Sequence, residues 1–227
     1  MKKWFLLCLT FLISLLGVAN TSTYAETEGN EAFIRAIHAS PDAPAVDIYI
    51  TKDKVLENVS FKDVSNYLPL KAGSYNIQIF QEGANANNEK PVIEKSIDVQ
   101  AGQSYTLAGI GTLNQLDLVV TGDQLQPVEE KAKVRVANLS PDAPSVDIVA
   151  VPNTILFENV SFPQVSDYLE VDPGEASIEV RPTGRTGSVY KIPNLELEEG
   201  GVYTAIAVGL VEGESALDFI LVKDQVR

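Results

Sequence analysis

The stretch Ser40-Pro41-Asp42-Ala43-Pro44-Ala45-Val46-Asp47-Ile48 occurs twice in this chain of 227 residues. It returns one hundred residues later as Ser140-Pro141-Asp142-Ala143-Pro144-Ser145-Val146-Asp147-Ile148, with a single change. Other residues recur around it in the same order: Arg35 and Arg135, Glu57 to Phe61 and Glu158 to Phe162, Gly102 and Gly200, Gly111 and Gly209. Because the spacing drifts by only a few residues, the two copies share one topology, and each is long enough to close its own core. The sequence therefore predicts two tandem domains, residues 31–121 and 133–224, joined by a polar linker at 122–132 that no apolar pattern crosses.

Within each copy the apolar residues alternate with polar ones. Tyr75, Ile77 and Ile79 alternate with polar neighbours, and Val46, Ile48 and Ile50 share one face of the segment that follows the corner. Turn residues return about every 8–12 positions, and no segment keeps a helical period. This pattern is typical of an all-β chain, and we expect about seven short strands in each of two antiparallel β-sandwich domains.

The first 25 residues have the pattern of a helical secretory signal peptide. Lys2 and Lys3 precede an apolar run from residue 4 to 18, and small residues lead to a cleavage point after Ala25. The run is shorter than the ~20 residues of a membrane-spanning helix. We predict that residues 1–25 are removed; the alternative is an uncleaved membrane anchor.

Composition excludes several classes of function for the mature chain. Cleavage removes Cys8, the only cysteine, so disulfides, thiolate metal sites and cysteine nucleophiles are excluded. An exported chain of this size without disulfides favours a bacterial origin. Loss of the two signal lysines leaves 15 basic against 31 acidic residues. No nucleic-acid partner is predicted, because neutralising phosphates needs clustered Lys and Arg. The acidic charge is typical of a protein kept soluble outside the cell.

The recurring motifs resemble a known family. The pattern Arg-x-x-x-x-Ser-Pro-Asp-Ala-Pro-x-Val-Asp-Ile, the Asn-Val-Ser-Phe and Tyr-Leu segments, and a late Gly-x-x-Tyr-Thr strand are similar to the bacterial secreted family called domain of unknown function 4397. The resemblance covers residues 33–120 and 134–222. It implies an exported β-sandwich of immunoglobulin-like kind, and it transfers no activity and no catalytic residues.

The sequence offers no pair of groups for catalysis. His38 is the only histidine, and Asn138 stands at the matching position of the second copy. A serine hydrolase needs a base beside its nucleophile, and the Gly-x-Ser-x-Gly elbow is absent. We predict no catalytic residue, no cofactor and no enzyme activity.

The acidic residues of the repeated stretch have two interpretations. Asp42 and Asp47, with Asp142 and Asp147, could supply part of the six to eight oxygens that calcium requires. The structural interpretation is that Asp42 and Asp142 cap their own turns between two prolines, while Arg35 pairs with Asp47 and Arg135 with Asp147 across neighbouring strands. The residues predicted to specify this corner are Arg35, Ser40, Pro41, Asp42, Pro44 and Asp47, with Arg135, Ser140, Pro141, Asp142, Pro144 and Asp147 in the second copy.

These observations lead to one expected function and one alternative. We expect a secreted, non-catalytic binding or spacer module at or outside the bacterial cell envelope, in contact with an extracellular or cell-surface ligand and not with the membrane after signal cleavage. The alternative is a calcium-dependent adhesion or matrix protein that uses the two acidic corners.

Overall fold

The computed structural model describes residues 29–225, which form sixteen β-strands. The predicted signal peptide lies outside the described residues. Within 29–225 no helix is long and apolar enough to cross a membrane. The all-β prediction is confirmed.

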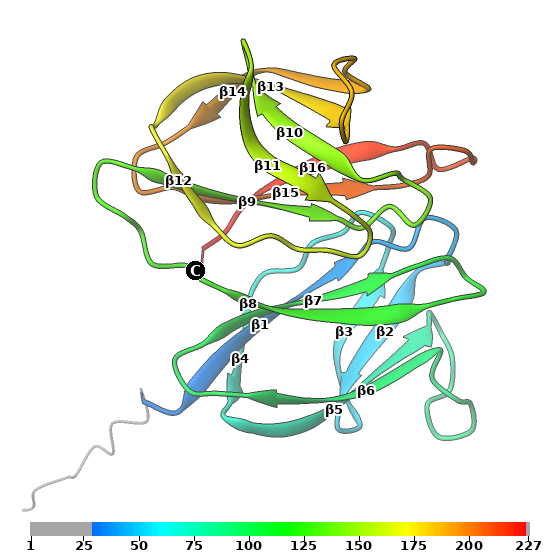
Figure 1. The fold of residues 1–227 in the computed structure, drawn as a ribbon. Coiled ribbons are helices and arrows are strands. Elements are labelled where there is room, and N and C mark those ends of the chain that lie inside the picture. The colour runs from blue at the N-terminus through cyan, green and yellow to red at the C-terminus, as the bar shows by residue number, and fades with distance from the viewer. Residues whose placement is uncertain (1–28, 226–227) are drawn as a thin grey trace, which may run out of the picture.

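Each copy of the repeat contributes eight strands to two four-stranded sheets (Figure 1). The first module has one sheet in the order β4-β1-β7-β8 and one in the order β3-β2-β5-β6, and the second repeats this plan as β12-β9-β15-β16 and β11-β10-β13-β14. The strands of the first module are β1 (Glu31–His38), β2 (Val46–Ile50), β3 (Asp53–Val59), β4 (Leu68–Lys71), β5 (Gly73–Gln81), β6 (Ile93–Val99), β7 (Ser104–Ile110) and β8 (Asp117–Asp123). Those of the second are β9 (Ala132–Asn138), β10 (Val146–Ala150), β11 (Thr154–Val160), β12 (Leu169–Val171), β13 (Gly174–Pro182), β14 (Tyr190–Leu197), β15 (Val202–Val208) and β16 (Asp218–Lys223).

Two details differ from the sequence-based expectation. Each module has one strand more than the seven expected, namely the short β4 in the first and β12 in the second, which pairs with the first strand of its module. The neighbouring pairs β1–β7 and β9–β15 are parallel, whereas all the other pairs are antiparallel. A strand that begins the module thus lies beside one near its end, so the first strand is central in its sheet.

The central strands are buried on both faces. Ile34 and Ala36 of β1 point into the core of the first sandwich, whereas Ile37 and Ala39 belong to a second apolar cluster. That second cluster combines residues of both modules: Ile37, Ala39, Ala108 and Ile110 from the first, with Ala137, Leu139, Ile206 and Val208 from the second. The sheet β4-β1-β7-β8 therefore packs against β12-β9-β15-β16, and the two sandwiches stack (Figure 1).

The connection between the modules is short. Strand β8 continues to Asp123 and strand β9 begins at Ala132, so residues 124–131 form the irregular part of the segment expected at 122–132. The Lys133 Nζ donates a hydrogen bond to the Gln124 carbonyl, which fastens one end of this segment to the second module. Because one apolar cluster combines residues of both modules, the two sandwiches form a single packed unit.

Candidate functional site

The repeated corner fastens a distant loop. The Asp42 carboxylate accepts a hydrogen bond from the Leu113 backbone N–H at 2.8 Å, between β7 and β8. Asp142 accepts two such bonds in the β15–β16 loop, from Val211 at 2.8 Å and Glu212 at 2.9 Å. The expectation that each Asp caps its own turn is thus corrected, because its acceptor atoms face a loop about seventy residues away. The role is structural in both copies.

The second aspartate of each corner is buried and fully used. Asp47 accepts hydrogen bonds from the Lys54 Nζ at 2.8 Å and from the Asn58 backbone N–H at 3.0 Å. Burial opposes its charge, but these donors lower the pKa of the Asp47 carboxyl below its ordinary value. The prediction that Arg35 pairs with Asp47 is wrong.

In the part of the chain that the structure describes, Asp147 has no lysine partner equivalent to Lys54, and uncharged hydrogen-bond donors take its place. Its carboxylate accepts from the Asn159 N–H at 2.8 Å, the Thr183 hydroxyl at 3.0 Å and the Gly184 N–H at 3.3 Å. The backbone N–H of Asn159 is the main reason that the pKa of the Asp147 carboxyl is lowered. The prediction that Arg135 pairs with Asp147 is wrong as well.

These residues do not fit a calcium site. Calcium takes six to eight oxygen ligands, and both carboxylates of each corner already accept N–H or O–H donors from different segments. Within residues 29–225, no three His, Cys, Asp or Glu side chains gather closely enough to hold a metal ion. The alternative of a calcium-dependent adhesion protein therefore has no support from the geometry of the corners.

The two arginines cross between the modules. Arg35 of the first module lies with its Nη2 2.7 Å from the Asp224 Oδ1, which follows the last strand of the second. Arg135 of the second module pairs in return with Asp123, at the end of β8 in the first. All four side chains are at most 2% exposed. Burial disfavours the charged guanidinium of Arg35, yet Asp224 and the other carboxylate nearby raise its pKa. Each arginine thus forms an ion pair with a carboxylate of the other module.

Threonine and tyrosine side chains complete each exchange. Thr106 receives a bond from the Arg35 Nε at 2.8 Å and donates to Asp123 at 2.6 Å, and Tyr67 donates to the same carboxylate at 2.6 Å. In the second module Thr204 and Tyr168 do the same for Arg135 and Asp224. Burial raises the pKa of both phenols, so they stay protonated donors.

Asp123 and Asp224 were not predicted from the sequence as site residues. The signal was present in the repeat: Asp123 ends the last strand of the first copy, and Asp224 directly follows the last strand of the second, at a spacing close to that of the other repeated residues. Their roles depend on the docking of one module on the other, which alternation within a strand does not show. The repeated polar residues of the chain therefore serve the corners and the interface.

His38 is a structural residue by its contacts. It is 5% exposed, and its Nε2 lies 3.0 Å from the Pro44 carbonyl oxygen, inside the corner. Asn138 in the second copy also bonds a backbone carbonyl, that of Val160, at 3.2 Å. Both side chains thus tie the first strand of their module to a neighbouring segment through a backbone carbonyl.

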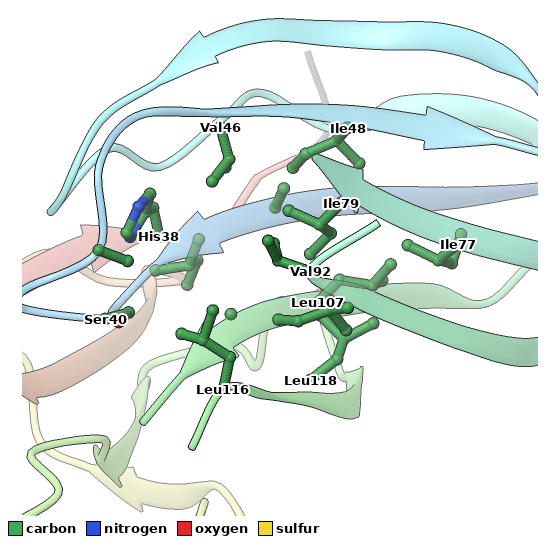
Figure 2. Close-up of a pocket in the computed structure, with 15 residues that line it drawn as sticks. His38, Ser40, Val46, Ile48, Ile77, Ile79, Val92, Leu107, Leu116 and Leu118 are labelled. Atoms are coloured by element: carbon green, nitrogen blue, oxygen red, sulfur yellow. The ribbon is translucent and has the colours of Figure 1, made fainter. Parts of the chain in front are cut away.

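The interiors of the two sandwiches differ sharply. In the first module Ile48 and Ile79 of one sheet meet Leu107 and Leu118 of the other, with His38 at one end (Figure 2). The space left there is about 30 Å³. The second module encloses a cavity of about 330 Å³ between its sheets. Its lining is mainly apolar and comes from all the layers of that sandwich, including Ala150, Leu156, Phe157, Ala176, Ile178, Tyr190, Ile192, Leu195, Ala205, Phe219 and Leu221. This cavity is the candidate binding site.

A model of the family described as a domain of unknown function, DUF4397, matches residues 32–149 and 132–227. A search of curated proteins finds no match. Among solved structures, the family-26 carbohydrate-binding module of Eubacterium rectale Amy13K, in complex with maltoheptaose, is 10% identical, with a TM-score of 0.28 over 86% of this chain and 97% of that chain. The Bacillus anthracis TIE protein is 12% identical, with a TM-score of 0.25 over 83% of this chain and 38% of that one. Similarity at this level indicates no function.

Proposed function

Because the chain belongs to the DUF4397 family through both of its modules, and the description of that family gives no activity, we propose its function from its own geometry. The protein is an exported, non-catalytic binding module that acts at or outside the bacterial cell envelope. The supporting observation is that the repeated polar residues hold the fold together, whereas an apolar cavity is left open for a ligand. The repeated aspartate, threonine and tyrosine side chains are engaged within the fold, and the second sandwich encloses an apolar cavity of about 330 Å³.

The polar contacts argue against catalysis. Catalytic acids, bases and nucleophiles are held beside a space that a substrate can enter. Here the buried Asp123 and Asp224 are neutralised across the module interface, and His38 bonds a backbone carbonyl. The signal sequence supports export, and the excess of acidic residues suits a soluble protein outside the cell.

Cell fractionation tests this function. The full chain, produced in a bacterium with a C-terminal epitope, is expected in the envelope or the medium, with the mass of a chain that begins at Glu26. A matched variant without residues 1–25 is expected to stay in the cytoplasm. Retention of the full chain inside the cell would contradict export. Hydrolysis of an ester or glycoside substrate by the purified mature chain, abolished by one acidic substitution, would contradict a non-catalytic role.

A further inference from the structure

At three positions of the cavity lining the second module has alanine where the first module has a larger residue. The strand registers align the modules, because Ile50 pairs with Ile77 and Ala150 with Ile178 at equivalent places. By the same registers, three residues of the first core correspond to alanines that line the cavity: Ile50 to Ala150, Tyr75 to Ala176, and Leu107 to Ala205. These three exchanges remove about thirteen non-hydrogen atoms, whereas three larger lining residues, Phe157 for Leu56, Tyr190 for Ile93 and Phe219 for Leu118, return about ten elsewhere. The space is therefore redistributed toward the three alanines.

The edge of the sandwich also differs between the modules. In the first module Lys95 of β6 reaches across to β8, where its Nζ donates to the Leu118 carbonyl at 2.6 Å. Ile192 of β14 stands at the equivalent register position. It is followed by an irregularity in the β13–β14 register at Asn194, whose φ is 53°. A bulge of this kind bends an edge strand. Leu221 of β16 lines the cavity and is 43% exposed, so the cavity reaches the surface beside this edge strand.

The lining of the cavity extends along the strands. Its lining includes every second residue of β14 from end to end, namely Tyr190, Ile192, Leu195 and Leu197 once the bulge is allowed for. A strand of this length spans roughly 20 Å. A volume of about 330 Å³ spread over that length suits a narrow, unbranched molecule better than a compact one.

The chemistry of the lining selects an apolar occupant. Two polar lining residues are already engaged, because the Arg135 guanidinium pairs with Asp123 and the Tyr203 hydroxyl accepts the Glu198 N–H at 3.0 Å. Buried water needs two to four polar partners, and apolar cavities of about 150 Å³ bind benzene. On that scale the cavity holds at most roughly thirteen carbon atoms, enough for a chain of about ten.

We propose that the second module binds a linear acyl or alkyl chain of about ten carbons between its sheets, with the polar head at the surface beside β16. The Asp172 and Asp218 carboxylates are paired with Lys131 and Lys62, and the Arg135 guanidinium of the lining is paired with Asp123. The lining therefore offers no unpaired cation to an anionic head, and the proposed head is neutral. This proposal names the ligand class of the binding function above and rests on it. The first module does not share the site, because Ile50, Tyr75 and Leu107 fill the equivalent space.

Calorimetric titration of the mature two-module protein with 1-decanol tests the proposal. The wild type is expected to bind with a negative heat-capacity change and to melt at a higher temperature in the presence of the alcohol. Ala205→Leu and Ala150→Ile each restore the residue of the first module, and each is expected to raise the Kd at least tenfold. Ala101→Leu, at an exposed turn, is the matched control and is expected to leave the Kd unchanged.

Two results would overturn the cavity site: no binding of 1-decanol by the wild type, or an unchanged Kd in both filled variants. Circular dichroism confirms that each variant is folded, and a single folded filled variant is enough for the comparison. Failure here, with the chain still exported and inactive toward substrates, removes the ligand class and leaves the proposed function standing. Retention of the chain in the cytoplasm would remove the proposed function whatever the titration shows.

Discussion

Replacing Asp224 with alanine is the sharpest test of the exchange between modules. The substitution leaves the Arg35 guanidinium buried without its counter-charge, and it takes an acceptor from the Thr204 and Tyr168 hydroxyls. Removing one member of a buried ion pair costs roughly 3–5 kcal/mol. For a folded unit of this size, each kcal/mol lowers the melting temperature by about 2–4 °C, so a loss of about 6–20 °C is expected.

The measurement is thermal and urea unfolding of the chain without residues 1–25, followed by circular dichroism because the only tryptophan, Trp4, lies within those residues. One cooperative transition is expected, since each module supplies the carboxylate that its neighbour's arginine needs. Asp123→Ala should cost about as much as Asp224→Ala, because the two ends of the exchange are equivalent.

Lys223→Ala is the matched control for this experiment. Lys223 is adjacent in sequence and also pairs with a carboxylate, that of Glu198 at 2.6 Å, but both side chains are at least 40% exposed. Exposed pairs contribute about 0–1 kcal/mol. A loss in Asp224→Ala no larger than in this control would refute the view that the buried exchange joins the modules.

Three further predictions concern the corners. Asp142→Ala removes the acceptor of two backbone N–H groups and should cost about 1–3 kcal/mol, more than Asp42→Ala, which removes the acceptor of one; equal urea midpoints would contradict this. Gly209→Ala should destabilise by more than about 1 kcal/mol, because the φ of Gly209 is 90° and a Cβ there would lie 2.4 Å from the Ala216 carbonyl oxygen; an unchanged melting temperature would contradict it. The pKa of Asp47 is lowered on folding, so the ionised carboxylate adds to the free energy of unfolding above about pH 4, and this contribution is lost as the pH falls through the folded-state pKa. Asp47→Asn should therefore lose less free energy of unfolding than the wild type between about pH 5 and 2. Equal losses in the two proteins would contradict this.

Local patterns were sufficient to predict the strands and the repeat. Alternation in the segment that contains Ile77 and Ile79 identifies a half-buried strand without any knowledge of its partners. The prolines and glycines that bound such segments act through their own backbone preferences. Features of this kind depend on the sequence within about ten residues, and the structure confirms them.

The ion-pair partners of the two arginines could not be predicted from such local patterns. Arg35 and Ile37 occupy the face of β1 that is turned away from the core of its own sandwich, and a one-sided interpretation of the strand assigns that face to solvent. Its burial depends on a second module that packs against it. The apolar residues on this outer face, Ala108 and Ile110 of β7 among them, were the available sign of a further layer. Their position beside Arg35 explains why the arginine is paired across the interface and not with Asp47.

The cavity shows why the two copies differ where they do. The corners fasten a loop in each module, and the arginine exchange joins the modules, so both features are present in both copies, whereas each sandwich packs its own interior. Substitution of a buried leucine or isoleucine by alanine typically costs about 2–5 kcal/mol, and Ala150 and Ala205 stand where the first module has isoleucine and leucine. The second sandwich keeps a space of about 330 Å³ where the first keeps about 30 Å³, which points to a role for the space itself. A filled variant such as Ala205→Leu should then be more stable than the wild type and poorer at binding, as expected where function opposes stability.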